Sequence, residues 1–90
     1  MIKNLGAINY SRRFNKQLSK APLEIKIAFR NKRELFIQDS FNSQLNNHKL
    51  SGKLKGLRSI NITGDWRAIY SEYKGSIVFE MLGTHSQLYK

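Results

Sequence analysis

The hydrophobic pattern of this chain changes its period once, and that change restricts the fold more than any other feature. Residues 12–40 carry apolar side chains three or four positions apart, as in amphipathic helices. Residues 57–82 instead alternate apolar and polar side chains, as in strands with one buried face. Helices followed by a run of strands indicate an α+β fold, a two-layer sandwich in which helices cover one face of the sheet.

The helical half divides into two helices. Ser11 is a good N-cap for a helix over 12–19. Pro22 suits the first position of a second helix over 22–40, where its missing N–H is not needed. Together they predict a helical hairpin, preceded by a short strand within residues 6–10. Helical spacing gathers these apolar residues on the inner faces: Phe14, Leu18, Ile25, Ala28, Phe29, Leu35 and Phe36.

The alternating half predicts a three-stranded antiparallel meander. The strands cover residues 57–62, 66–70 and 76–82, with turns at 63–65 and 73–75. The predicted order is therefore β-α-α-β-β-β. The chain has 90 residues and shows no repeat or linker, so we expect one domain over residues 1–90.

Alternation also assigns side chains to the two faces of the sheet. Ile60 and Ile62 are expected to point toward the helices, while Ser59 and Asn61 point to a face left open. Arg67 and the C-terminal segment would make that face a basic, concave surface. Which face Arg67 takes stays open, because Ile69 shares its parity.

The charge indicates the kind of partner. Sixteen Lys and Arg against six Asp and Glu give a net charge of +10, which favours polyanions or an acidic protein. No acid lies between Ser40 and Gly64, a stretch that contains four basic residues: Lys49, Lys53, Lys55 and Arg58. A second basic set, including the helical stripe of Lys26, Arg30 and Arg33, has the simpler interpretation of a solvated helix face.

Several classes of protein are excluded or disfavoured. The chain has no cysteine, which excludes a disulfide scaffold, a thiolate metal site and a thiol nucleophile. Two histidines and six carboxylates offer little for a metal site, so we expect no metal and no small-molecule cofactor. No run approaches the roughly 20 apolar residues of a membrane span, and the first ten residues lack a signal-peptide core. A cytoplasmic protein without a membrane partner is expected.

Two histidines are the candidates for chemistry. His48 and His85 flank the meander, so the sheet can bring both to one edge. Because histidine titrates near neutrality, such a pair can take a proton from a ribose 2′-OH and give one to the departing 5′-oxygen. Arg67 would offset charge on the phosphate. Other candidates would hold flanking phosphates or stack on bases: Lys53, Lys55, Arg58, Trp66 and Tyr89.

Each of these residues also has an ordinary structural interpretation. A loop histidine is usually surface, and Asp65 after Gly64 is a turn residue by default. Trp66 alternates with Arg67 and suits the core, and Tyr89 can seal the sheet edge. The residues alone therefore indicate a small basic domain that binds RNA or an acidic partner, and they do not distinguish an enzyme from a binding module.

Four segments carry a resemblance to a known family: residues 47–50 (NHKL), 52–58 (GKLKGLR), 64–70 (GDWRAIY) and 83–89 (GTHSQLY). Together they resemble the RelE/ParE superfamily of type II toxin–antitoxin toxins, and most closely its YafQ-like branch. The resemblance implies a RelE-like fold and a ribosome-dependent mRNA endonuclease that inhibits translation. It also implies a cognate antitoxin, an acidic partner that covers the basic face, besides ribosome and mRNA.

The resemblance also implies catalytic roles. It makes His85 the general acid and His48, with or without Asp65, the base; Arg67 steadies the scissile phosphate and Tyr89 orients the base of the nucleotide. Lys49, Lys53, Lys55, Arg58, Asn61 and Trp66 are expected to contact RNA or ribosome.

Asn61 departs from the family pattern, because YafQ-like members often carry a histidine there and RelE a lysine. Asparagine supplies neither charge nor proton at neutral pH. The alternative functions are a ParE-type gyrase inhibitor, a non-catalytic member of the fold, or a plain nucleic-acid-binding module. His85 speaks against the first, because such toxins generally lack this histidine.

Overall fold

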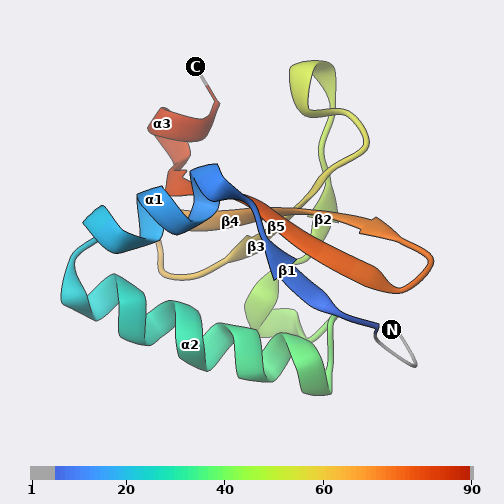
Figure 1. Cartoon of the computed structure of the whole chain (residues 1–90), viewed down its shortest axis with the longest axis horizontal. Helices are drawn as coiled ribbons and strands as arrows, with labels where there is room; N and C mark the ends of the chain where they lie inside the picture. The colour runs from blue at the N-terminus through green and yellow to red at the C-terminus, as the bar shows by residue number, and fades with distance from the viewer. Residues whose placement is uncertain (1–5, 90) are drawn as a thin grey trace.

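The computed structural model describes residues 6–89 and has the predicted α+β architecture (Figure 1). A five-stranded sheet has the order β1-β5-β4-β3-β2. The elements are β1 (Ile8–Tyr10), α1 (Arg12–Lys20), α2 (Leu23–Gln38), η1 (Ser43–Leu45), β2 (His48–Lys49), η2 (Gly52–Leu54), β3 (Arg58–Asn61), β4 (Trp66–Tyr73), β5 (Ser76–Thr84) and α3 (His85–Leu88).

The predicted meander is confirmed as β3, β4 and β5, which pair antiparallel in sequence order. Lys74 and Gly75 form the turn between β4 and β5, both with positive φ (51° and 85°), as a two-residue type I′ hairpin requires. The first strand, β1, is also confirmed and pairs parallel with β5. Sequence reasoning missed β2, a two-residue strand at the far edge of the sheet.

The two predicted helices form, and the bounds of the second differ from the prediction. Ser11 caps α1 as expected, because its hydroxyl accepts from the Phe14 amide at 3.0 Å. Pro22 was expected as the first helical residue of α2; it is instead the N-cap, with ψ of 153°. The helix ends at Gln38, two residues before the predicted end, because Asp39 leaves the helical conformation.

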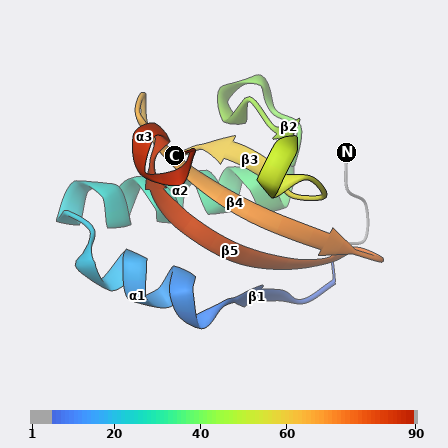
Figure 2. The ribbon, with the colours of Figure 1, turned by 90° about the horizontal axis from the view of Figure 1, so that it is seen from above.

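Helix α2 lies beneath the sheet, whereas α1 runs along the edge of β5 where β1 has ended (Figure 2). β1 pairs only with Ile77–Phe79 of β5, so the rest of that edge needs other partners. The Ser11 hydroxyl donates to the Glu80 carbonyl at 2.8 Å, and the Leu82 amide donates to Gln17 Oε1 at 2.8 Å. Side chains of α1 and its cap thus continue the edge pairing that β1 begins.

The face of the sheet toward α2 holds the apolar core. Phe79 is fully buried at its centre, with ring centroids 5.3 to 5.9 Å from five other aromatic rings: Tyr10, Phe14, Phe29, Phe36 and Tyr70. Ile60, Ile62 and Ala68 complete this cluster, which confirms the predicted orientation of the two isoleucines. None of the helices within residues 6–89 combines the length and apolar character needed to cross a lipid bilayer.

The opposite face, called the second face below, carries Ser59, Asn61, Arg67 and Ile69, which are cross-strand neighbours. Arg67 therefore shares the face of Ile69. The expectation that this face is open was wrong for its centre, because Ser59 and Ile69 are fully buried. The reason is that α3 and the segment around η2 lie over the sheet on this side (Figure 2). Two hollows lie over the sheet between α3 and the segment around η2.

Candidate active site

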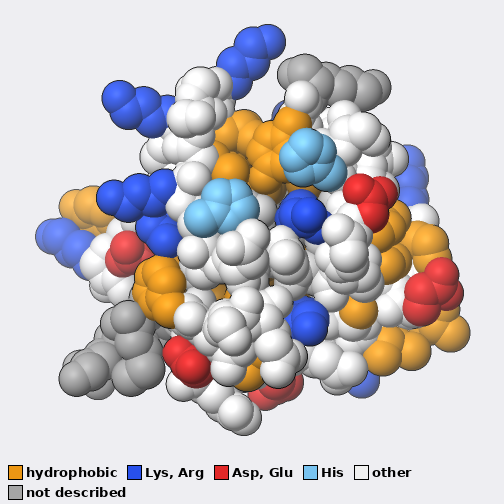
Figure 3. All heavy atoms as spheres, turned by 180° about the vertical axis from the view of Figure 1, so that it is seen from behind, with side chains coloured by type: hydrophobic (Ala, Val, Ile, Leu, Met, Phe, Trp, Pro, Cys, Tyr) orange, Lys and Arg blue, Asp and Glu red, His pale blue; other side chains and the backbone are white. Residues whose placement is uncertain are grey.

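One hollow of about 430 Å³ lies on the second face between β2 and α3. Four of the predicted catalytic side chains line it: His48, Arg67, His85 and Tyr89. Figure 3, a view from behind Figure 1, shows the two histidines near each other with a Lys or Arg side chain beside them. The remaining lining residues are Asn46, Lys49, Leu50 and Ser51. The fold thus gathers candidate residues that lie up to 41 positions apart in the sequence, from His48 to Tyr89.

His48 is the first residue of β2 and is held in one tautomer. Its Nδ1 lies 2.8 Å from the Asn46 carbonyl oxygen, which only accepts, so Nδ1 carries the proton. In the neutral ring Nε2 is then unprotonated and able to accept a proton. Asn46 reaches this position with a left-handed backbone (φ 45°), which asparagine tolerates better than most residues.

Asn47 holds the segment that carries His48 in place, a role that sequence reasoning missed. Its Nδ2 donates to the Ser40 carbonyl and to the Tyr70 hydroxyl, each at 2.8 Å. Its Oδ1 accepts from Arg58 Nε at 2.8 Å. The only signal in the sequence was that Asn47 stands next to His48 in the first family-like segment.

The Tyr70 hydroxyl in this network is buried. Burial raises the pKa of Tyr70 above its ordinary value, although the hydrogen bond from Asn47 and the nearby Arg58 guanidinium act in the lowering direction. Arg58 also lies over the Phe41 ring, with its guanidinium carbon 5.1 Å from the ring centroid. Arg58 is thus engaged within the protein, which supports a structural part besides any contact with RNA.

Arg67 is anchored by the turn between β3 and β4. Its Nη1 donates to the carbonyl oxygens of Thr63, Gly64 and Trp66 at 3.2, 3.1 and 3.2 Å. These bonds use one of the three guanidinium nitrogens and fix the direction of the side chain. The other two nitrogens remain to donate toward an anion in the hollow.

His85 and Tyr89 come from the short helix α3. Thr84 and Gln87 form a reciprocal capping box that starts this helix. The His85 amide donates to the Asp65 carbonyl at 3.0 Å, which ties α3 to the turn before β4. The His85 ring is exposed, and its centroid lies 4.6 Å from that of the Tyr89 ring.

Other predicted site residues lie outside this hollow. Asp65 is exposed, and its contact with the site is the backbone bond to His85. Trp66 packs against the core and lines a hollow beside Ala21 and Leu82 on the helix side. Lys53 lines a neighbouring hollow, and Lys55 and Arg58 line a third together with Lys49.

Asn61 stands opposite Arg67 in the β3–β4 register. Its Oδ1 is buried and accepts no hydrogen bond from any of the residues 6–89. An acceptor oxygen therefore stands beside Arg67 where many relatives are expected to carry a basic or titratable group.

The model of the family described as "Bacterial toxin of type II toxin-antitoxin system, YafQ" matches residues 6–90. The chain belongs to this family. Among solved structures, YafQ from Escherichia coli strain BL21(DE3) is similar at a TM-score of 0.80 and 25% identity, over 92% of this chain and 97% of that one. The YafQ chain in the E. coli DinJ–YafQ toxin–antitoxin complex gives a TM-score of 0.76 and 26% identity, over 92% and 96%.

A more distant structure shows how widely the fold is shared. A YoeB/ParE toxin from Agrobacterium tumefaciens has a TM-score of 0.73 at 13% identity, over 89% of this chain and 99% of that one, which is evidence of fold alone. Comparison with the curated proteins found no match. The predicted resemblance and fold are therefore confirmed, and this YafQ-family chain is a type II toxin–antitoxin toxin.

Proposed function

We propose that this YafQ-family toxin is a ribosome-dependent mRNA endonuclease that works by acid–base catalysis. The observation that carries the proposal is the hollow in which His48, Arg67, His85 and Tyr89 meet, on a chain of net charge +10. Two histidine rings and a guanidinium that line one hollow supply a base, an acid and a cation, the groups that cleavage of an RNA phosphodiester by its own 2′-OH requires.

His48 is the general base in the first half of the reaction. The Asn46 carbonyl keeps the proton of the neutral ring on Nδ1, so Nε2 takes the proton of the ribose 2′-OH. The 2′-oxygen then attacks the adjacent phosphorus, and the bond from phosphorus to the 5′-oxygen breaks. His85 in its protonated form gives a proton to that 5′-oxygen. The products are a 2′,3′-cyclic phosphate and a 5′-hydroxyl.

Arg67 balances the charge that grows on the phosphate oxygens during attack. Its Nη1 is anchored to three turn carbonyls, so little reorganisation of the side chain is needed when the charge develops. Tyr89 stacks on a base next to the scissile phosphate. The Asp65 carbonyl positions His85, the general acid, by accepting a hydrogen bond from its backbone amide. The general base is His48.

We further propose that a cognate antitoxin neutralises this chain. The similar YafQ of E. coli is found in a complex with DinJ. The charge of +10 on this chain favours an acidic partner that covers the second face. The ribosome supplies both the message and further phosphates for Lys49, which lines the hollow, and for Lys53 and Lys55, which lie outside it.

The deciding experiment maps mRNA cuts by primer extension in a reconstituted translation reaction, with and without ribosomes. His85→Ala is expected to lower cleavage by about 10²–10⁴-fold, because the 5′-oxygen then leaves without a proton donor. Ser86→Ala, an exposed neighbour in the same helix, is the matched control and should cut like the parent. Circular dichroism checks that both variants stay folded.

Cuts that need both ribosomes and His85 would support the proposal. Equal cutting by His85→Ala would remove the proposed acid. An uncut message, together with growth arrest by the folded protein, would favour gyrase or another target.

A further inference from the structure

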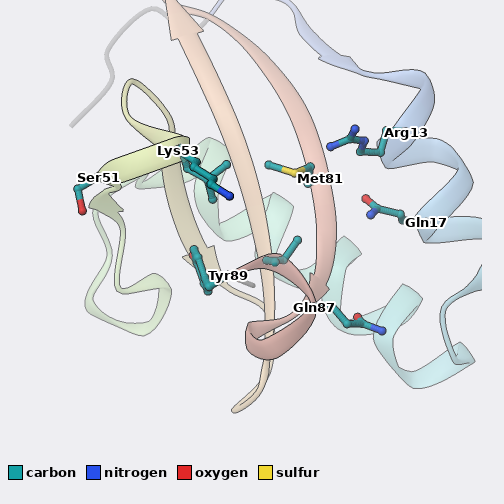
Figure 4. A pocket seen from close by; sticks show the side chains of 9 residues that line it. Arg13, Gln17, Ser51, Lys53, Met81, Gln87 and Tyr89 are labelled. Atoms are coloured by element: carbon teal, nitrogen blue, oxygen red, sulfur yellow. The ribbon is translucent and has the colours of Figure 1, made fainter.

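A second hollow, of about 600 Å³, adjoins the candidate active site and shares Ser51 and Tyr89 with it. Its volume is within the range of about 300–1,000 Å³ usual for ligand pockets. Met81 of β5 forms its floor, between α1 on one side and η2 and α3 on the other (Figure 4). Of the residues that line it, the function proposed above uses Tyr89, to stack on a base, and Lys53, to contact phosphate.

One part of the lining is apolar and suits a flat ring. Met81, Leu54 and Leu88 line the hollow together with the ring of Tyr89. A thioether and an aromatic ring both pack well on the face of a nucleobase. This apolar part of the lining suits a base better than RNA backbone, whereas Arg13 and Lys53 at its rim can also contact a phosphate.

Most of the polar groups in the lining are donors; the Ser51 hydroxyl can donate or accept, and Gln87 Oε1 already accepts from the Thr84 amide. Arg13 and Lys53 have donors and no acceptor. The Gln17 oxygen already accepts from the Leu82 amide at 2.8 Å, so its amide nitrogen is left to donate. Arg13 and Gln17 both extend from α1 toward Met81 (Figure 4).

Donors of this kind distinguish the purines. Guanine presents two adjacent acceptors, O6 and N7, on its major-groove edge, whereas adenine places an amino donor where guanine has O6. The Arg13 guanidinium and the Gln17 amide N–H can therefore both donate to the guanine edge, whereas on adenine one of these donors would face the amino donor.

We propose that this hollow is a nucleobase subsite that prefers guanine. It would bind the base of a nucleotide that flanks the scissile phosphate, since both hollows meet at Ser51 and Tyr89. The placement next to the scissile phosphate rests on the proposed function, whereas the preference for guanine rests on the lining alone.

Gln17→Glu tests the subsite with little structural change. The glutamate keeps an oxygen for the Leu82 amide and replaces the free donor by an acceptor. Gln44→Glu, at an exposed position of η1, makes the same change of charge away from the hollow and is the matched control. A message library with all four bases on both sides of the cut reports the preference.

The parent is expected to favour guanine over adenine at one flanking position, and Gln17→Glu to reduce that ratio about fivefold or more. Gln44→Glu should keep it. Arg13→Ala, paired with its neighbour Arg12→Ala, gives a second test if Gln17→Glu does not fold. A parent without guanine preference, or an unchanged ratio in both Gln17→Glu and Arg13→Ala, would overturn the subsite.

Titration with 5′-GMP and 5′-AMP, followed by NMR at the Met81 methyl group, separates the subsite from cleavage. If no message is cut, yet GMP binds more tightly than AMP and Gln17→Glu removes the difference, the subsite stands without the nuclease. The opposite result is ribosome-dependent cutting in which neither nucleotide shifts the Met81 signal and the guanine-to-adenine ratio is the same in the parent and in Gln17→Glu. That result would support the nuclease and contradict the subsite.

Discussion

The two faces of the sheet are built by different rules. On the helix face, five aromatic rings surround Phe79, and the one buried hydroxyl among them, that of Tyr70, accepts a hydrogen bond from Asn47. On the second face, Ser59 Oγ and Asn61 Oδ1 are buried without a hydrogen-bond partner among residues 6–89. A buried polar atom without a hydrogen-bond partner costs stability, so these two atoms lower the stability of the second face beside the candidate site; Arg33 Nε of α2 is the third such atom within residues 6–89.

The comparison predicts that a truncation on the helix face costs far more stability than one on the second face. Phe79→Ala should lower the free energy of unfolding by about 3–5 kcal/mol, because it leaves a cavity among five rings. Met81→Ala, two positions along the same strand and only half-buried, should cost clearly less. Urea unfolding of both variants measures this difference. Equal losses would mean that the second face contributes as much to stability as the core.

The converse prediction concerns activity. Arg67→Ala should lower the cleavage rate by about 10²–10³-fold, the usual loss when one fixed donor to a developing anion is removed. Its effect on the free energy of unfolding should be smaller than that of Phe79→Ala, since only turn carbonyls lose a partner.

Lys74→Ala is the matched control for charge, because Lys74 is exposed in the β4–β5 turn, outside both hollows. Single-turnover cleavage on ribosomes compares the two variants. Equal losses would show that the overall positive charge, and not the place of Arg67, determines the rate.

Most of the fold was predictable because the spacing of apolar residues along each element shows which of its faces is buried. Ile25, Phe29 and Phe36 repeat at helical intervals along α2, and Ile60 and Ile62, like Ala68 and Tyr70, alternate with residues of the other face. β2 was not predictable: two residues are too short to show a period, and they pair with β3 residues nine and eleven positions later.

The site was predictable only in part, since residue type reveals a candidate but not its surroundings. The motifs named His48 and His85, yet the tautomer of His48 depends on the Asn46 carbonyl and its position on the bonds of Asn47. Gln17 was missed because its contact with Leu82 spans 65 positions and leaves no local pattern. Trp66 was expected to contact RNA, with a place in the core as the alternative. Its packing against the core agrees with the alternative.

Tyr70 joins the two faces, because its ring lies in the core and its hydroxyl accepts from Asn47 beside His48. Its pKa is raised by burial, so the folded state favours the neutral hydroxyl. This contribution to stability is fully present below the ordinary value of about 10 and is lost as the pH rises through the folded value, since the unfolded chain ionises first. Tyr70→Phe should therefore flatten the loss of stability above about pH 10.

At neutral pH the same variant should cost about 1 kcal/mol, for the hydrogen bond lost by Asn47. Tyr73→Phe is the control, because Tyr73 is 73% exposed. Urea unfolding between about pH 8 and 11, a range that brackets the ordinary tyrosine pKa of about 10, measures how steeply the free energy of unfolding falls with pH in the parent and in both variants. If Tyr70→Phe and Tyr73→Phe lose stability with pH as steeply as the parent, the buried hydroxyl does not link the core to the His48 segment, and the two faces are independent.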